Sequence, residues 1–287
     1  MTRIYGQEVP YAIVDVVEDL PKVDEMLAVV CTGTGIGLVA FMTGYYLQKQ
    51  PLNYRDLGEI CSLTMLSDPI VDEETGYFDT PGVKLRFTTS GRVPMLLAFG
   101  PRQPAAWEAH FAGSALFDVI LKISRRPIIL SVGGYGVPSK EKMPDVVGRP
   151  NCAVAEEFMR ANKIPKIDEI QKAEGIGKIL NAGQGFQAAL PMLAIRRKVP
   201  AVFFLGTALM PEHFVVRMDP QAVRHVMLKI SELVGFNLDG KEIEESISRE
   251  TTRETSREQA QQRAIYELAR RFSFDEGPEL PDSNMYI

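Results

Sequence analysis

The chain has 287 residues, of which 45% are hydrophobic and 24% are charged, a composition typical of a globular protein with one large domain or two small ones. Its formal net charge of −5 argues against nucleic acid as a partner, because phosphate binding needs an excess of Lys and Arg on one face. No apolar run approaches the roughly 20 residues that span a bilayer and no signal peptide is recognisable, so we expect no membrane partner.

Short apolar segments alternate with helical patterns from Tyr11 to about Gly235. The predicted strands are Tyr11–Val16, Met26–Cys31, Ile60–Leu66, Val83–Thr89, Arg92–Phe99, Pro127–Val132 and Ala201–Leu205. The predicted helices are Ile36–Gln48, Pro104–Lys122, Cys152–Asn162, Gln184–Lys198 and Asp219–Val234. Strands with little polar alternation, interleaved with helices, predict an α/β fold, a layered sandwich with a mostly parallel sheet.

Two local signals refine this prediction. Ser90-Gly91 is a hairpin-type turn between two predicted strands, and it adds an antiparallel piece to the sheet. Asp219-Pro220 opens the last predicted helix with a good capping residue and with proline at the first helical position.

The composition changes towards the C-terminus, and we expect an α/β core domain over residues 1–240. Residues 241–274 are a charged extension that contains a Ser/Thr-Arg-Glu repeat of period four, with pairs such as Glu245 and Arg249 at helix-pairing distance. On a helix of 3.6 residues per turn, charges that repeat every four residues spread around the helix and leave no apolar face to bury. The segment is therefore either a solvent-exposed helix or disordered. Residues 275–287 contain two prolines, four acidic residues and no basic one, which predicts a mobile tail.

The segment Gly33-Thr34-Gly35-Ile36-Gly37 follows a predicted strand and opens a predicted helix, which is the context of a dinucleotide-binding turn. Glu59 lies at the start of the next predicted strand and Asp68 beyond its end, so no acidic residue closes that strand, where a ribose contact is expected. Two alternatives stay open: a nucleoside- or dinucleotide-binding enzyme that uses the Gly33–Gly37 turn, or a tight turn that needs glycine for structural reasons.

Further glycines follow other predicted strands, in Gly133-Gly134-Tyr135-Gly136 and in Gly183-Gln184-Gly185. The ends of parallel strands meet at one edge of a sheet, where ligands bind in such folds, but turns alone also account for these glycines. The segment Pro101-Arg102-Gln103-Pro104 is a rigid loop that leads into a helix. It shapes a pocket or an interface, or it is a plain turn.

Signatures of common catalytic sites are missing from the sequence. It contains no GxxxxGK[ST], HExxH or GxSxG motif. The three histidines are scattered: His110, His213 and His225. The three cysteines, which have no CxxC spacing, are Cys31, Cys61 and Cys152. We therefore predict a protein that is not an enzyme, that uses no cofactor or metal, and whose thiols are buried and reduced in the cytoplasm.

The last three residues differ in kind from the polar tail before them. Met285 offers an apolar anchor, Tyr286 a phenol that can donate a hydrogen bond, and Ile287 a terminal carboxylate. Placed after Pro281-Asp282-Ser283-Asn284, this ending is suited to binding a pocket on another protein, with a lysine as partner of the carboxylate.

Five segments, in this order and spacing, resemble the proteasome assembly chaperone family, in the branch of its second subunit and particularly its archaeal homologues. They are Gly33–Gly37 with Tyr45-Tyr46-Leu47, Gly133–Gly136, Gly183–Phe186, Ala201–Leu205 and the helix that starts at Pro220. The resemblance covers most of residues 26–240 and implies an α/β core that binds other subunits and has no established catalytic centre.

The ending Met285-Tyr286-Ile287 is similar to the hydrophobic–tyrosine–X (HbYX) motif of proteasome activators. This resemblance implies that the tail enters pockets between the α-subunits of the core particle, where the carboxylate meets a lysine and gate opening follows. One short tail binds weakly, and several tails from one particle gain affinity through effective concentration, so we expect a homo-oligomer. A pure assembly scaffold is a further alternative.

Overall fold

The computed structural model describes most of the core and a few residues beyond position 240. The described residues are 12–33, 36–66, 70–71, 78–79, 82–105, 107–137, 139–141, 143–173, 185–209, 218–238, 240, 243–245, 247 and 249. The chain divides into two compact units, Met1–Ile243 and Glu244–Ile287. The predicted boundaries at 240 and 274 stay predictions, because few residues beyond the first unit are described.

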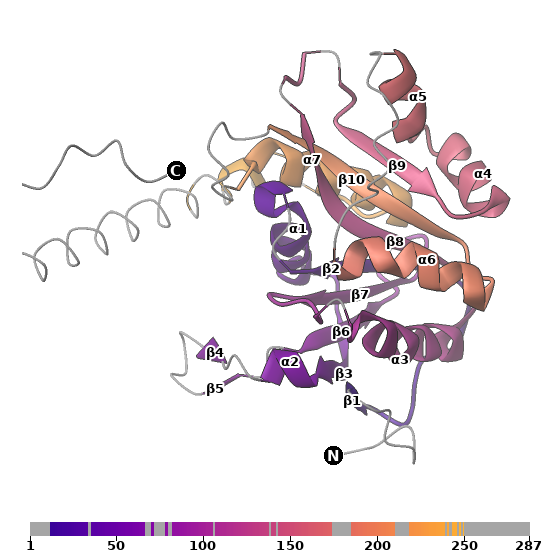
Figure 1. Cartoon of the computed structure of the whole chain (residues 1–287). Coiled ribbons are helices and arrows are strands. Elements are labelled where there is room, and N and C mark those ends of the chain that lie inside the picture. Colours follow the sequence, from indigo (N-terminus) through magenta and orange to yellow (C-terminus); the bar gives the residue numbers. More distant parts are fainter. Residues whose placement is uncertain are drawn as a thin grey trace, which may run out of the picture. The chain divides into compact units, whose positions relative to one another are not determined.

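A sheet of eight described strands forms the centre of the first unit (Figure 1). In spatial order the strands are β1 (Ala12–Val16), β3 (Arg55–Ser62), β6 (Val83–Thr88), β7 (Met95–Gly100), β2 (Val23–Thr32), β8 (Ser124–Val137), β10 (Ala201–Leu209) and β9 (Val146–Pro150). The central strands β7, β2, β8 and β10 run parallel, and the strands on either side of them pair antiparallel. The predicted α/β fold with a parallel sheet at its centre is confirmed.

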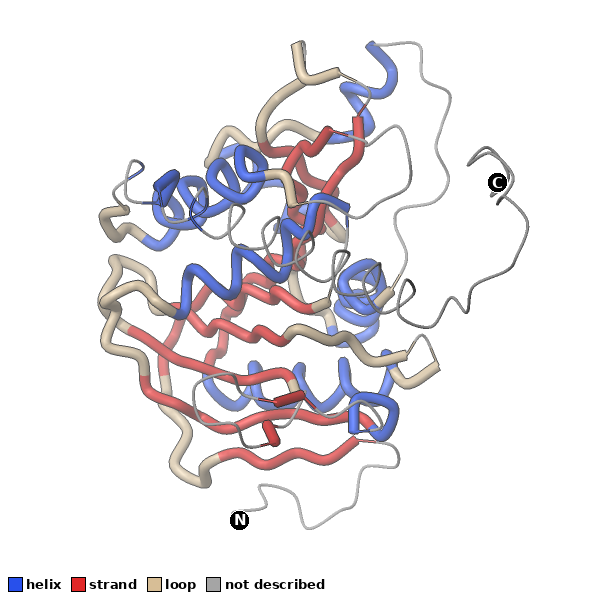
Figure 2. Tube along the Cα trace, turned by 90° about the vertical axis from the view of Figure 1, so that its left-hand side faces the viewer, coloured by secondary structure: helices blue, strands red, loops and turns tan. Residues whose placement is uncertain are grey.

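Helices cover both faces of this sheet (Figures 1 and 2). They are η1 (Ile36–Leu38), α1 (Val39–Gln48), α2 (Leu63–Leu66), α3 (Ala109–Ile123), α4 (Ala153–Ala161), α5 (Ile167–Ala173), α6 (Phe186–Arg197) and α7 (Pro220–Val234). Helices α3 and α6 pack together on one face, α1 and α7 pack together on the other, and α4 and α5 lie beside β9. A short separate pair of strands, β4 (Ile70–Val71) and β5 (Phe78–Asp79), lies outside the main sheet.

Burial on both faces explains the apolar strands. In β2 every residue from Met26 to Thr32 is buried, because alternate side chains face the two helix layers. Met26, Ala28 and Val30 belong to the large core cluster under α3 and α6. On the opposite face, α1 lies so close to the sheet that a Cβ atom added to Gly44 would come within 2.8 Å of the Cβ atoms of Cys31 and Phe99.

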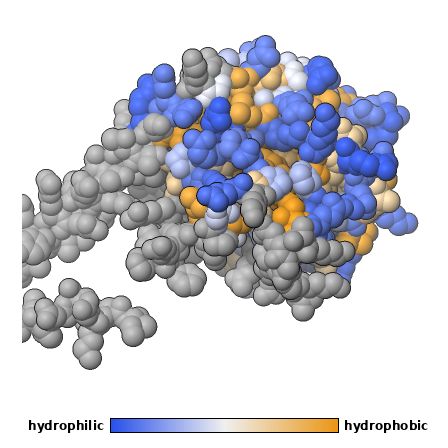
Figure 3. Space-filling model, turned by 90° about the horizontal axis from the view of Figure 1, so that it is seen from above, coloured by the Kyte–Doolittle hydropathy of each residue, from blue (hydrophilic) through white to orange (hydrophobic). Residues whose placement is uncertain are grey.

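The surface seen from above is mainly hydrophilic, with separate hydrophobic areas between the polar ones (Figure 3). Several large apolar side chains are exposed on the helices around one side of the sheet. Those on α3, α4 and α6 are Leu121, Val154, Met192 and Ile195. Isolated exposed apolar residues are ordinary, but Leu121 and Val154 border the same groove, which is described below.

Two predicted local features are confirmed. Strands β6 and β7 pair antiparallel, as predicted, although residues 89–94 connect them and the second strand begins at Met95 instead of Arg92. Beyond position 240, Glu245 and Arg249 form the expected ion pair one helical turn apart, with 3.6 Å between Glu245 Oε2 and Arg249 Nη2.

Other element boundaries were predicted wrongly. The strand predicted over Ile60–Leu66 ends at Ser62, and the chain turns into α2 because Thr64 N donates a hydrogen bond of 3.1 Å to the buried carboxylate of Glu108. The helix predicted from Pro104 begins at Ala109. Strand β9 and helix α5 were not predicted, and Tyr11 lies outside the described residues.

The glycines at 133–136 do not form a turn. Strand β8 continues through them to Val137, paired with β10 along this whole stretch. A Cβ atom at Gly134 would lie 2.0 Å from the carbonyl oxygen of Ile36, so glycine is needed here because the backbone of η1 crosses the strand at close range. Gly134 therefore serves the close packing of η1 against β8.

Candidate functional site

The carboxyl ends of the parallel strands are the first place to look for a ligand site in this fold. Gly33, which follows β2, has a φ of 70°, and its N–H donates to Gly100 O at 3.0 Å. Gly185 caps the amino end of α6 with a φ of 88°. Both positive φ values favour glycine, which agrees with the tight-turn alternative. Thr34, Gly35 and Gly183 lie outside the described residues.

The side chain of Gln103 fills the space between these two glycines. Gln103 Oε1 accepts a hydrogen bond of 3.1 Å from Phe186 N, the first N–H of α6. A Cβ atom added to Gly185 would lie 2.5 Å from the same oxygen, and one added to Gly33 would lie 3.0 Å from the Gln103 Cβ. This hydrogen bond lies at the start of α6, whereas the segment after Gly33 leads into η1 and α1. The described contacts therefore give Gly33 and Gly185 a structural role.

The loop Pro101–Pro104 is thus more than a plain turn. It delivers a side chain that joins the end of β2 to the start of α6. A second contact holds the same helix, since Ser131 Oγ on β8 donates a hydrogen bond of 2.6 Å to Gln187 O. No sequence signal identified Gln103 as the residue that makes the connection.

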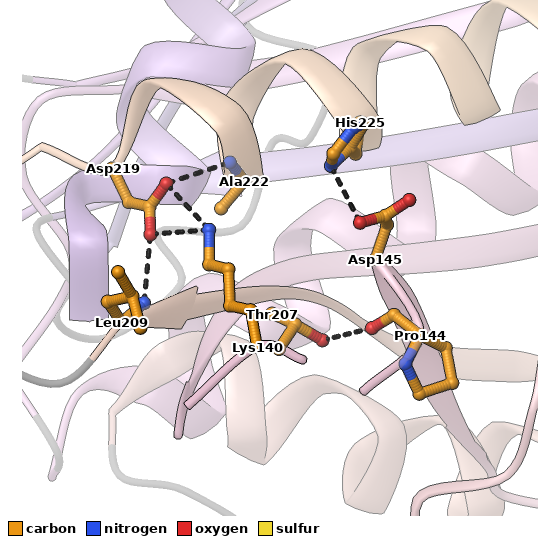
Figure 4. Close-up of polar contacts among 8 residues, drawn as sticks. All are labelled: Lys140, Pro144, Asp145, Thr207, Leu209, Asp219, Ala222 and His225. Atoms are coloured by element: carbon orange, nitrogen blue, oxygen red, sulfur yellow. Dashed lines mark hydrogen bonds and ion pairs between the residues drawn. The ribbon is translucent and has the colours of Figure 1, made fainter. Parts of the chain in front are cut away.

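A network of charged groups lies at the carboxyl ends of β8 and β10 (Figure 4). Asp219 caps α7, as predicted, by accepting a hydrogen bond of 3.0 Å from Ala222 N. Its carboxylate also accepts from Leu209 N at 2.8 Å, at the end of β10, and pairs with Lys140 Nζ at 2.7 Å. One carboxylate therefore joins the end of β10, the loop after β8 and the start of α7.

The protonation of Asp219 reflects this environment. Burial by itself raises the pKa of the carboxyl, but the hydrogen bonds from Lys140 and from the backbone N–H groups of Ala222 and Leu209 outweigh it and hold the pKa below its ordinary value. The side chains of Asp219 and Lys140 are 12% and 27% exposed, so the pair is screened less than a surface ion pair. The charged carboxylate is the form that the fold requires.

His225, on the next turn of α7, faces a carboxylate from the same loop (Figure 4). Its Nδ1 lies 3.1 Å from Asp145 Oδ1. Burial lowers the pKa of His225 and outweighs the opposing effect of Asp145. Thr207 completes the attachment of this loop, because its hydroxyl donates to Pro144 O at 2.6 Å and its N–H donates to Asp145 O at 2.9 Å.

A cavity of about 430 Å³ opens beside this network. Among the groups that line it, Asp145 pairs with His225, and Lys229 Nζ lies 2.8 Å from Glu232 Oε2. The contact between Asp145 and His225 attaches the loop after β8 to α7, and the described lining contains no Ser, Thr or Cys that His225 could activate as a nucleophile. The described part of the chain also contains no group of three His, Cys, Asp or Glu side chains that could hold a metal ion.

The remaining residues singled out by the sequence are not brought together. His110 is exposed on α3, with its ring 5.7 Å from that of Phe111, and His213 lies outside the described residues. Cys31 and Cys61 are buried as expected, and burial raises the pKa of the Cys31 thiol. Cys152 is exposed before α4, so the prediction of a buried thiol was wrong there, because the short turn between β9 and α4 faces solvent.

The residues predicted to bind a partner, Met285, Tyr286 and Ile287, lie outside the described residues. None of the helices in the described part of the chain is both long and apolar enough to span a membrane.

The chain shares its fold with solved structures of proteasome-associated proteins. PbaB of Pyrococcus furiosus, an archaeal proteasome activator, matches with a TM-score of 0.67 and 16% identity over 86% of this chain and 98% of that chain. PbaA of the same organism, an archaeal homologue of proteasome-assembly chaperone, matches with a TM-score of 0.61 and 17% identity over 88% and 95%. A proteasome-assembly chaperone homologue of Mycobacterium tuberculosis matches with a TM-score of 0.55 and 13% identity over 80% and 94%. No family model and no curated protein matched the chain.

Proposed function

We propose that this chain is an ATP-independent proteasome-binding protein that promotes assembly of the core particle, opening of its gate, or both. The observation that carries the proposal is the fold similarity to PbaB, an archaeal proteasome activator, which extends over 98% of that chain. The ending Met285-Tyr286-Ile287 is an independent feature of the sequence, and it supports the same partner.

In this proposal the tail binds pockets between the α-subunits of the core particle. Met285 inserts as the apolar anchor, the Tyr286 phenol donates a hydrogen bond, and the carboxylate of Ile287 pairs with a lysine of the pocket. The acidic residues before this ending keep the tail in solvent until it meets the pocket.

The proposal includes a homo-oligomer. One tyrosine and one small anchor contribute roughly 1.5–3 kcal/mol each, and ordering the tail cancels part of that gain. Several tails presented together by one oligomer raise the apparent affinity by about 10²–10⁴. The α/β unit then serves to hold the tails at a spacing that suits the ring of α-subunits.

The protein acts by binding and not as an enzyme. The sequence contains no P-loop, so stimulation of the core particle is expected without nucleotide. The nucleotide-binding alternative gains no support from the described contacts, in which Gly33 lies against the side chain of Gln103.

The deciding experiment changes the position of the terminal carboxylate. One glycine added after Ile287 moves the charge by about 3.5 Å, beyond the roughly 2.7–2.9 Å of a charge-assisted hydrogen bond, and leaves the net charge unchanged. We expect this extension and Tyr286→Ala to abolish stimulation of peptide hydrolysis by the core particle, with Tyr286→Phe intermediate. Full stimulation by the extended protein, or a strict need for ATP, contradicts the proposal.

A pull-down separates activation from assembly. Intact protein should retain the finished core particle, and protein truncated after Phe274 should not. A pure assembly scaffold would bind free α-subunits through the α/β unit and would leave finished particles unstimulated.

A further inference from the structure

A groove lies at the amino ends of the parallel strands, the opposite end of the sheet from Gly33 and Gly185. It has a volume of about 620 Å³. Its lining comes from the starts of β2 and β8, the residues just before β7 and β10, and the ends of α3, α6 and α7, together with α4. This volume falls in the range of about 300–1,000 Å³ that is typical of ligand sites.

Apolar side chains at the groove remain open to solvent. Leu121 of α3 is 40% exposed and Val154 of α4 is 59% exposed, and Phe158, one turn after Val154, is half-buried. A small molecule held inside the groove would leave such exposed apolar surface uncovered, whereas an extended peptide would cover it. The exposure therefore favours a segment of protein as the occupant.

Cations outnumber carboxylates in the lining. The positively charged lining residues are Arg125, Arg126, Arg197 and Lys198, and the negatively charged one is Glu25. Two of these arginines are already neutralised. Arg126 Nη2 lies 3.0 Å from Glu25 Oε1, and Arg197 Nη1 lies 3.1 Å from Asp118 Oδ1.

The other two cations, Arg125 and Lys198, are exposed, and neither has an ion-pair partner among the residues that the structure describes. Arg125 is the second residue of β8, and Lys198 directly follows α6 as its C-cap. The two cations therefore come from different parts of the chain and border the same groove. An occupant that complements this site brings about two negative charges next to a large apolar group.

We propose that this groove binds a short acidic segment of a partner protein, with one large apolar side chain between Leu121, Val154 and Phe158 and with carboxylates at Arg125 and Lys198. The tail of this chain is also acidic, but in the function proposed above it is engaged by the core particle while the protein acts. The assignment to a partner, and not to the tail, rests on that proposed function. The groove then forms a second contact, independent of the tail.

The test measures fluorescence polarisation of a labelled peptide, Glu-Asp-Leu-Phe-Asp-Glu, against the intact protein, with Lys-Lys-Leu-Phe-Lys-Lys as the basic control. We expect saturable binding of the acidic peptide alone, which weakens with added salt. The double variant Arg125→Glu/Lys198→Glu should weaken binding about tenfold or more, because two attractions become repulsions. Val154→Asp should weaken it as well, and both variants alter exposed side chains, so unchanged melting temperatures will show that they fold.

Arg160→Glu is the matched control, because Arg160 is an exposed cation on the same helix as Val154 and is not part of the lining. Equal affinity for the basic peptide, or full affinity in the double variant, overturns the proposal. Binding that appears only after truncation beyond Phe274 identifies the chain's own tail as the occupant and overturns it too. A change of oligomer size in the double variant, seen by analytical ultracentrifugation, identifies a second copy instead and has the same consequence.

Failure here is distinguishable from failure of the proposed function. Tyr286→Ala removes stimulation of the core particle in that function but leaves the groove unchanged, so peptide binding should persist. If the peptide does not bind and intact tails still stimulate the core particle, the groove assignment fails alone. If the peptide binds and no tail variant affects stimulation, the proposed function fails, and with it the reason for excluding the tail as the natural occupant.

Discussion

Asp219 is the residue whose removal should destabilise the α/β unit most directly by electrostatics. Its carboxylate caps α7 through Ala222 N, accepts a second hydrogen bond from Leu209 N and pairs with Lys140 (Figure 4). Asp219→Ala removes all of these at once and leaves the N–H groups of a strand end and a helix start without their acceptor.

The expected cost follows from these contacts. Loss of an N-cap costs about 0.5–2 kcal/mol, a hydrogen bond to a charged group contributes about 1.5–3 kcal/mol, and the ion pair lies between the surface value of about 0–1 kcal/mol and the larger buried value. Because these contributions share one carboxylate they are not additive, and we expect a total near 3 kcal/mol for Asp219→Ala. For a unit of this size that corresponds to a fall in melting temperature of about 6–12 °C.

Guanidinium unfolding followed by circular dichroism measures the change in the free energy of unfolding. Asp219→Asn keeps an acceptor oxygen but not the charge, and Lys140→Met removes only the ion pair, so both should cost less than Asp219→Ala. Glu232→Gln is the control: its carboxylate is 63% exposed in the pair with Lys229, and we expect at most about 0.5 kcal/mol. A cost for Asp219→Ala no larger than that of Glu232→Gln refutes the reasoning.

The pH dependence of stability tests whether the charged form of the Asp219 carboxylate is the stabilising one. The folded pKa of Asp219 is lowered, so its charge contributes fully above the unfolded value of about 3.9, and the contribution is lost as pH falls through the folded pKa. The difference between wild type and Asp219→Asn should therefore be constant above about pH 5 and shrink only below about pH 4. A difference that is already falling between pH 7 and pH 5 contradicts this assignment.

Three further predictions test other parts of the chain. Burial lowers the folded pKa of His225, so the free energy of unfolding should decrease as pH drops from the ordinary pKa of about 6.5 through the folded pKa. In a series of melting temperatures from pH 7.5 to pH 5, His225→Gln should reduce this decrease. An unchanged pH dependence in the variant contradicts the prediction. Truncation after Phe274 removes few apolar side chains and should change the melting temperature by at most a few degrees, since such losses cost about 0.5 kcal/mol or less; a large drop shows a structural tail. Gly134→Ala should lower the free energy of unfolding by about 1–3 kcal/mol, because the added Cβ meets the Ile36 carbonyl oxygen. Gly240→Ala is the control, since the nearest atom to its added Cβ is 3.4 Å away. Equal denaturation midpoints for the two variants refute the close contact at Gly134.

Much of the fold could be predicted from the sequence because burial on both faces leaves a continuous apolar pattern. Strand β2 and helix α7 were found for that reason, and the cap at Asp219 was recognised from the Asp-Pro pair. The failures share a cause in tertiary contacts. The chain leaves β3 at Ser62 because a distant carboxylate, Glu108, binds Thr64, and no local pattern between residues 60 and 66 encodes that partner.

The glycines were the hardest residues to interpret from sequence. Glycine permits a turn, a ligand approach and a backbone crossing, and composition does not separate these uses. Gly134 lies where the backbone of η1 crosses β8 at Ile36, and Gly185 caps α6 next to Gln103. Both contacts join residues about 80 to 100 positions apart in the chain. Gln103 itself carried no signal, because an amide in a proline-rich loop is equally suited to solvent.

The two ends of the parallel strands have opposite characters, and this bears on function. Near the carboxyl ends, where enzymes of this architecture hold their ligands, Gln103 from the loop after β7 binds the first N–H of α6, and Ser131 within β8 binds the same helix. At the amino ends, a groove of about 620 Å³ lies beside exposed apolar side chains and the cations Arg125 and Lys198. Catalysis needs an enclosed site with activated groups, whereas protein binding needs an accessible surface with complementary charge. The open end of this sheet has the second set of properties, which is the physical reason to look for partner proteins there.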